Sequence, residues 1–100
     1  MARMDLHRAP GSTPGLIVEV QSDLLPYLPT RVVVPLVPRR EGPDPVAHLN
    51  PCFDIDGTEH MLLPQYIGIV PVTALRLPIG NLTQHQDTIT RALDRLLTDV

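Results

Sequence analysis

The last twenty residues, 81–100, carry the only sustained helical periodicity in the sequence. Thr83 followed by Gln86 predicts a capping box at the start of a helix, and Pro78 and Gly80 interrupt the chain just before it. Apolar residues recur on one face of this helix with i, i+4, i+7, i+8, i+11 spacing: Ile89, Leu93, Leu96, Leu97 and Val100. We therefore expect a C-terminal amphipathic helix, and the rest of the chain must supply the apolar surface against which it packs.

Proline and glycine exclude a helical bundle for the remainder of the chain. Twelve prolines and six glycines among 100 residues leave little room for other long helices. The length fits a single domain, residues 1–100, whose small core would gain from self-association. Apolar residues make up 43% of the sequence but include few aromatic ones, so the core must consist of Leu, Ile and Val.

The charge pattern and the single cysteine limit the classes of ligand that the chain is expected to bind. The net charge is −3, all eight cationic residues are Arg, and they form no basic stripe, which argues against nucleic acid as the primary ligand. Cys52 is the only cysteine, so neither a disulfide framework nor a clustered thiol metal site is expected. Its neighbours Pro51 and Phe53 predict a buried, apolar setting. The sequence shows no signal peptide and no membrane-spanning run, so we expect a soluble cytoplasmic protein.

Short β-strands fill the chain before the helix. The dipeptide Asp56-Gly57 between alternating runs predicts a type I′ hairpin. Pro35 lies inside a nearly continuous apolar strand and requires a bulge or a missing ladder bond. Residues 38–51 form a long, Pro-rich loop, and loops of this length are often functional. The expected strands are residues 3–8, 16–23, 31–37, the two arms of the hairpin within 53–63, and a long strand within 64–77 that is broken near Gly68 or Pro71. The pattern is typical of a mainly β fold, a small antiparallel barrel or sheet capped by one C-terminal helix.

No familiar catalytic or metal-binding constellation is present. The four histidines, His7, His48, His60 and His85, are dispersed and lack metal-ligand spacing, so we expect no metal and no cofactor. The sequence also contains no phosphate-cradling glycine loop and no G-x-S-x-G motif.

Arg31 has two interpretations. An Arg that opens a strand of a small barrel can clamp a phosphate, as a ribonuclease requires. It can equally pair with Glu19 or Asp23 across the sheet. Pairing is favoured, because no general base is obviously placed beside it.

Two stretches taken together resemble a known family. Residues 18–25, which contain the motif V-x-V-Q-S-D, and residues 30–36 resemble the second and third strands of the CcdB toxins. The similarity continues in the same order through Leu49-Asn50-Pro51, Ile69-Val70-Pro71-Val72 and residues 82–97, and covers nearly the whole chain.

This resemblance implies a homodimer of SH3-like barrels that is the toxin half of a type II toxin–antitoxin pair. It implies a protein that is not an enzyme and that binds the A subunit of DNA gyrase and traps it on cleaved DNA. It also implies a CcdA-like, partly disordered antitoxin that neutralises the dimer and co-represses the operon. DNA would be contacted only through the antitoxin complex, and no membrane would be involved.

Arg39-Arg40-Glu41 in the long loop is either a solvated segment or, together with Arg8, a candidate surface for gripping the antitoxin. The resemblance also assigns residues to the gyrase contact. The gyrase contact would comprise Ser22, Leu24, Leu25, Asp87, Thr90, Arg91, Asp94, Thr98, Asp99 and Val100.

The end of the chain keeps two alternatives open. The well-known plasmid toxins of the family end in Trp-Gly-Ile, whereas this chain ends in Thr98-Asp99-Val100 and contains no Trp. One alternative is therefore a CcdB-like binding protein without toxicity. The other is a MazF-type endoribonuclease on the same scaffold, which would need Arg31 and a histidine such as His60 to converge in one cleft.

Overall fold

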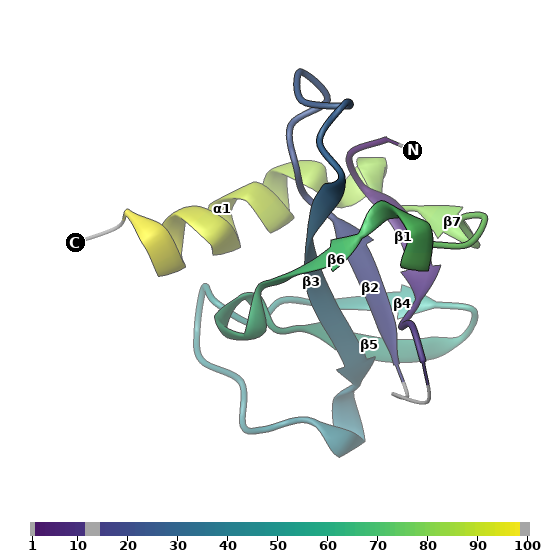
Figure 1. The fold of residues 1–100 in the computed structure, drawn as a ribbon. Coiled ribbons are helices and arrows are strands. Elements are labelled where there is room, and N and C mark those ends of the chain that lie inside the picture. Colours follow the sequence, from purple (N-terminus) through teal and green to yellow (C-terminus); the bar gives the residue numbers. More distant parts are fainter. Residues whose placement is uncertain (1, 12–14, 99–100) are drawn as a thin grey trace.

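The computed structural model describes residues 2–11 and 15–98. Within them the chain forms seven strands and one α-helix, joined in part by short 3₁₀ turns, and so confirms a mainly β fold with a C-terminal helix (Figure 1). The elements are β1 (Asp5–Arg8), β2 (Leu16–Glu19), β3 (Thr30–Pro38), η1 (Arg39–Glu41), β4 (Cys52–Ile55), β5 (Thr58–Leu62), η2 (Pro64–Tyr66), β6 (Gly68–Pro71), η3 (Val72–Ala74), β7 (Gly80–Asn81), η4 (Thr83–His85) and α1 (Gln86–Leu97).

The strands form one antiparallel sheet in the order β4-β5-β3-β2-β1-β7, and β3 is its centre. On the edge of β3 away from β2, β6 pairs with Thr30–Val33 and β5 pairs with Leu36–Pro38. Pro35 lies between these two pairings, and its carbonyl accepts a hydrogen bond of 2.9 Å from Leu63 N–H. The N–H and carbonyl of a strand residue point to the same side of the strand. The N–H that Pro35 lacks would therefore point to the gap between β6 and β5, where no ladder hydrogen bond is needed. The expected missing ladder bond is confirmed.

The hairpin between β4 and β5 forms as its sequence predicts. Ile55 pairs directly with Thr58, so the connection has two residues. Asp56 and Gly57 have φ of +52° and +82°, the left-handed conformations that a type I′ turn requires. The long loop from Pro38 to Pro51 is also confirmed, and η1 is its first turn.

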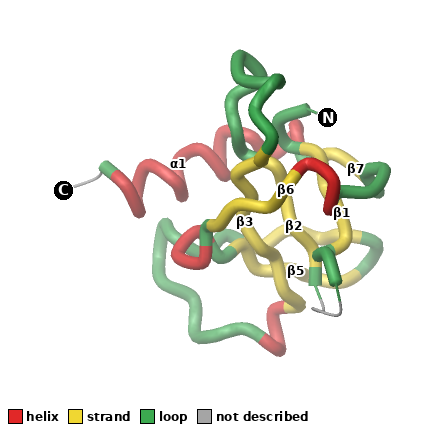
Figure 2. Tube along the Cα trace, viewed as in Figure 1, coloured by secondary structure: helices red, strands yellow, loops and turns green. Residues whose placement is uncertain are grey.

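The helix covers one face of the sheet, but not with the whole predicted stripe. Ile89 and Ala92 are buried in the same hydrophobic core as Val18 and Val34, and the partly buried Leu93 packs against this core. Leu97 is 65% exposed, because α1 projects beyond the sheet (Figure 2). The predicted buried position of Leu97 is therefore wrong, and the small Ala92 takes its place in the core.

The start of the helix also differs from the prediction. Helix α1 begins at Gln86, and its N-cap His85 makes no side-chain capping bond. The Thr83 hydroxyl instead donates to the Asn81 side chain, so the capping box is not formed. His85 is half-buried, and its ring lies 4.5 Å from that of Phe53 between centroids. Ring packing therefore anchors this end of the helix.

Residues 64–77 do not form the long strand that we expected. Only β6 is extended, and the 3₁₀ turns η2 and η3 flank it. A two-residue strand, β7, which the sequence did not indicate, pairs with Asp5 and Leu6 of β1. No helix in the part of the chain that the structure describes is both long and apolar enough to span a bilayer.

Candidate functional site

The connection from β2 to β3 presents apolar side chains on an ordered backbone. Leu24 is 84% exposed and Tyr27 is 77% exposed. The loop is nevertheless fastened at its base, since the buried Gln21 side chain donates to Leu25 carbonyl at 2.9 Å and accepts from Val32 N–H at 3.1 Å. The Ser22 hydroxyl accepts from Leu24 N–H at 3.1 Å. Hydrogen bonds of Gln21 and Ser22 therefore hold the backbone of this loop, and its apolar side chains point outward.

The outer face of α1 supplies the rest of the predicted gyrase contact. Asp87, Arg91, Asp94 and Thr98 are exposed, and Thr90 is half-buried. Eleven helical positions separate Asp87 from Thr98, which corresponds to about 16 Å along the helix axis. Asp99 and Val100 lie outside the described residues.

The structure places the loop beside the first half of this helix. Arg3 lies between them: its N–H donates to Asp23 Oδ1 at 2.8 Å, and its guanidinium Nη2 is 3.4 Å from Thr90 Oγ1. The two sequence segments that the resemblance singled out therefore share one side of the molecule.

A groove that the sequence did not indicate runs between α1 and the long loop. Its volume is about 1070 Å³, and Arg91, Asp94 and Thr98 line its helical wall. The opposite wall contains Val46, and Asn50 holds this part of the loop through bonds of 2.9 Å to Val46 N–H and Leu62 carbonyl. The only sequence signal for the groove was the length of the loop.

The residues expected to grip the antitoxin lie at the other end of the sheet. Arg8 pairs with Leu16, and Leu16 pairs with Leu36, three positions before Arg39. Arg8 and η1 therefore flank the end of the sheet opposite the 20–29 loop. Arg8, Arg39, Arg40 and Glu41 are all exposed. Arg39 makes a surface ion pair with Glu59 at 3.9 Å, and such pairs contribute little to stability.

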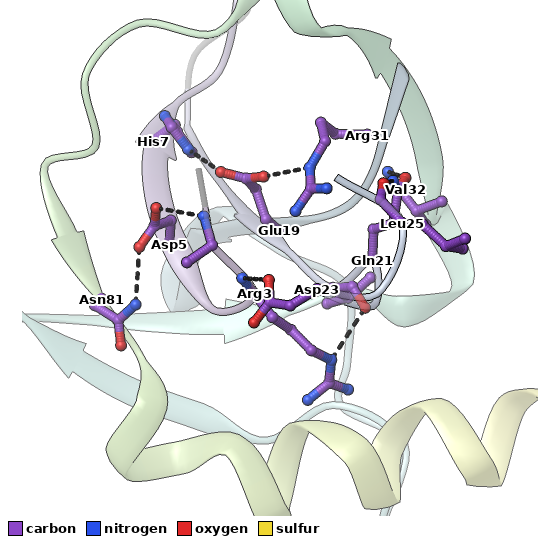
Figure 3. Close-up of polar contacts among 12 residues, drawn as sticks. Arg3, Asp5, His7, Glu19, Gln21, Asp23, Leu25, Arg31, Val32 and Asn81 are labelled. Carbon is purple, nitrogen blue, oxygen red and sulfur yellow. Dashed lines mark hydrogen bonds and ion pairs between the residues drawn. The ribbon is translucent and has the colours of Figure 1, made fainter. Parts of the chain in front are cut away.

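A charged cluster is buried on the face of the sheet that points away from α1 (Figure 3). Glu19 lies between Arg31 and His7: its Oε1 is 2.7 Å from Arg31 Nε and its Oε2 is 2.6 Å from His7 Nε2. All three side chains are 2% exposed or less. The predicted pairing of Arg31 with Glu19 is confirmed, whereas Asp23 bonds to Arg3 instead.

The hydrogen bonds of His7 restrict where the protons of this cluster can lie. His7 Nδ1 lies 3.0 Å from Arg76 carbonyl, which can only accept, so Nδ1 carries a hydrogen. One further proton must lie between Nε2 and the Glu19 carboxylate, which would otherwise face each other as two acceptors. The pair is then either imidazolium with carboxylate or imidazole with carboxylic acid, and Arg31 adds a positive charge in both cases. Arg31 Nη2 is a buried side-chain nitrogen without a hydrogen-bond partner among the described residues.

The cluster also contains the one group of possible metal ligands among the residues described. Asp5, His7 and Glu19 offer ligand atoms within 4.8 Å of one another. Their lone pairs are already engaged, however: His7 and Glu19 bond to each other, and Asp5 accepts from Ala2 N–H and Asn81 Nδ2. The donor set therefore fits a self-contained hydrogen-bond network better than a metal site.

Arg31 and His60, the two residues named for the ribonuclease alternative, do not converge. Arg31 pairs with Val70 on β6, whereas His60 pairs with Pro38 at the far end of β3. Positions 31 and 38 of one strand are about 23 Å apart at about 3.3 Å per residue. Arg31 is also buried and bonded to Glu19. The pair of residues named for this alternative is therefore wrong.

Cys52 is half-buried rather than fully buried as expected. Partial burial, and secondarily the charge of Glu59, raise the pKa of its thiol, while Arg39 opposes this effect. The thiol therefore stays protonated at neutral pH and is not an activated nucleophile.

The comparisons with known proteins agree with this architecture. A search of curated protein sequences finds no match. Among solved structures, the Mycobacterium tuberculosis toxin MazF-mt6 matches with a TM-score of 0.72 over 91% of this chain and 93% of its own. The sequence identity is 15%, so this similarity shows the fold alone, and it confirms the small barrel-like sheet with a C-terminal helix. The model of the CcdB protein family matches residues 3–99. The chain therefore belongs to the CcdB family, the toxin components of toxin–antitoxin systems.

Proposed function

We propose that this chain is a cytoplasmic, non-enzymatic toxin that binds the A subunit of DNA gyrase and traps the enzyme on cleaved DNA. The contact would be made by the target-binding face, which we define as Ser22, Leu24, Leu25, Asp87, Thr90, Arg91, Asp94 and Thr98, together with Asp99 and Val100. Membership of the CcdB family is the reason for proposing a toxin. The observation that carries it is the exposed, hydrogen-bonded loop with Leu24 at its tip, beside a polar helix face.

This arrangement has the composition of a protein interface. Leu24, Leu25 and Tyr27 form an apolar centre, and the charged residues of α1 form a polar rim. Exposed apolar side chains that are grouped on one loop and rimmed by polar residues are characteristic of interaction sites.

We further propose that the toxin is a homodimer. Tyr66, Ile69 and Leu97 are each more than 60% exposed and lie on η2, β6 and the projecting end of α1. A second copy would cover apolar area that the small core leaves in water. Analytical ultracentrifugation should therefore give twice the chain mass, and a monomer at micromolar concentration would contradict the dimer.

The neutralising partner would be a CcdA-like antitoxin that grips Arg8, Arg39, Arg40 and Glu41, and DNA would be contacted only in the complex with it. Substituting Arg8 and Arg39 with Ser should weaken capture of the antitoxin encoded beside this gene. Capture that is unchanged in both variants would show that the antitoxin binds elsewhere.

The gyrase contact is tested by charge insertion at the loop tip. Leu24→Asp and Leu25→Asp should each abolish growth arrest on induction and weaken pull-down of the gyrase A subunit at least about tenfold, because a charge would be desolvated in the interface. Leu77→Asp is the matched control, since Leu77 is 88% exposed and lies outside this face. Growth arrest in hosts with normal and toxin-resistant gyrase alike would contradict gyrase as the target.

A second candidate is a CcdB-like binding protein without toxicity. The segment Thr98-Asp99-Val100 favours it, since it contains no aromatic anchor and Asp99 adds a negative charge. Replacing these residues with Trp, Gly and Ile should create or strengthen toxicity if the remainder of the face is intact. A wild-type chain that already arrests growth would remove this candidate.

A further inference from the structure

The two parts of the target-binding face come from distant segments, and a single residue, Arg3, connects them through its backbone N–H and its side chain. The backbone N–H of Arg3 donates to Asp23 Oδ1 at 2.8 Å, which fixes the start of the 22–25 turn. The Arg3 Nε–H donates to Val20 carbonyl at 3.2 Å at the base of the same loop. Its Nη2 reaches Thr90 Oγ1 on α1 at 3.4 Å. Figure 3 shows the guanidinium turned from the loop towards the helix.

A strained backbone directs Arg3 to this place. Met4, the next residue, has φ of +74°, a conformation that residues other than glycine seldom adopt. The surroundings hold it there: Met4 N–H donates to Glu19 carbonyl at 2.7 Å, Met4 carbonyl accepts from Leu82 N–H at 2.8 Å, and the side chain is 1% exposed. Strain that is held by so many contacts is characteristic of functional regions.

The motif V-x-V-Q-S-D gains a physical meaning from these contacts. Gln21 bonds to both sides of the loop base, and Asp23 bonds to Arg3. Neither side chain needs to touch a partner for the motif to matter. Both hold Leu24 and Leu25 in place.

We propose that Arg3 is a positioning residue of the target-binding face. It fixes the 22–25 turn relative to α1, so that both parts meet a folded partner as one preformed surface. This inference rests on the proposed function for its partner, but the ordering of the loop is measurable in the free protein. If the competent loop conformation falls to about one tenth of the population, the apparent Kd rises about tenfold.

The variant Arg3→Met keeps the aliphatic stem and removes the guanidinium donors. Amide hydrogen exchange of residues 21–25 in the free protein should become at least about tenfold faster, and the Kd for the gyrase A subunit should rise about tenfold. Arg3→Lys, which retains one donor group, should restore part of both effects. Arg76→Met is the matched control, because the exposed Arg76 side chain lies outside the face.

Two further variants guard against general destabilisation. Asp23→Asn keeps an acceptor for Arg3 N–H and should exchange nearly as slowly as the wild type, whereas Asp23→Ala should exchange faster. Thr90→Val added to Arg3→Met should change loop exchange no further, since both remove the same contact.

The outcomes separate this inference from the proposed function. Loop exchange in Arg3→Met equal to that in Arg76→Met overturns the positioning role. Faster exchange with unchanged gyrase affinity overturns it as well. If the wild type does not bind gyrase, the proposed target is wrong, and the exchange data alone decide whether Arg3 orders the loop.

Discussion

The two faces of the central strands are both buried, but only one of them contains charged side chains. Towards α1, Val18 and Val34 are fully buried in the same apolar core as Ile89. On the other face, Glu19, which follows Val18 on β2, and Arg31, which lies three residues before Val34 on β3, are buried to within 2%. An apolar face loses stability in proportion to the atoms removed, whereas a charged face depends on every partner being present. The same backbone thus supports one tolerant core and one intolerant core.

Removing the shared partner of the charged face should have the largest effect. Glu19→Ala leaves Arg31 and His7 buried without their carboxylate and should lower the free energy of unfolding by about 3–5 kcal/mol. Urea unfolding followed by circular dichroism measures this change. Asp54→Ala, at an exposed site on β4, is the control, and an equal loss in both variants would show that burial of the charge is not the cause.

Truncating the apolar face should cost somewhat less. Ile89→Ala truncates a fully buried side chain on the inner face of α1. It should lower the free energy of unfolding by about 3 kcal/mol, because transfer free energy is lost and a cavity remains. Ile89→Val, which removes one methylene, should cost about 1 kcal/mol. If Ile89→Ala cost clearly more than Glu19→Ala, the ranking of the two faces would be reversed.

Replacing the whole charged cluster should have the smallest effect. The triple variant His7→Leu, Glu19→Leu and Arg31→Met substitutes apolar groups of comparable volume for all partners at once. Its free energy of unfolding should lie within about 1 kcal/mol of the wild type or above it, because no unpaired charge remains. A loss as large as that of Glu19→Ala would mean that the cluster is needed for the fold itself.

Sequence patterns predicted those features that depend on local geometry. The φ values that Asp56-Gly57 adopts, the interruption at Pro35 and the helix after Gly80 each follow from neighbouring residues. The pairing of Arg31 with Glu19 was also predictable, but as one of two options, because strand register decides between Glu19 and Asp23.

What the sequence did not predict depends on contacts between distant segments. His7 joins Glu19 only because β1 pairs with β2 in the register Leu6 to Val18. The groove beside α1 needs the path of the long loop, and the burial of Ala92 in place of Leu97 needs the extent of the sheet beneath the helix. For the target-binding face, the resemblance named its residues, but only the structure shows Arg3 between its two parts.

The pairing of β1 with β7 sets the order in which this protein can assemble during synthesis. Strand β1 is synthesised long before its outer neighbour, residues 80–81, and before Leu82, whose N–H donates to Met4 carbonyl. Until then a nascent chain carries an open edge strand, the kind of surface on which chains aggregate. A translation product that stops before residue 80 also lacks Thr90 and the whole of α1. Such a fragment has no completed target-binding face, so a chain must be translated through α1 before it can present this face.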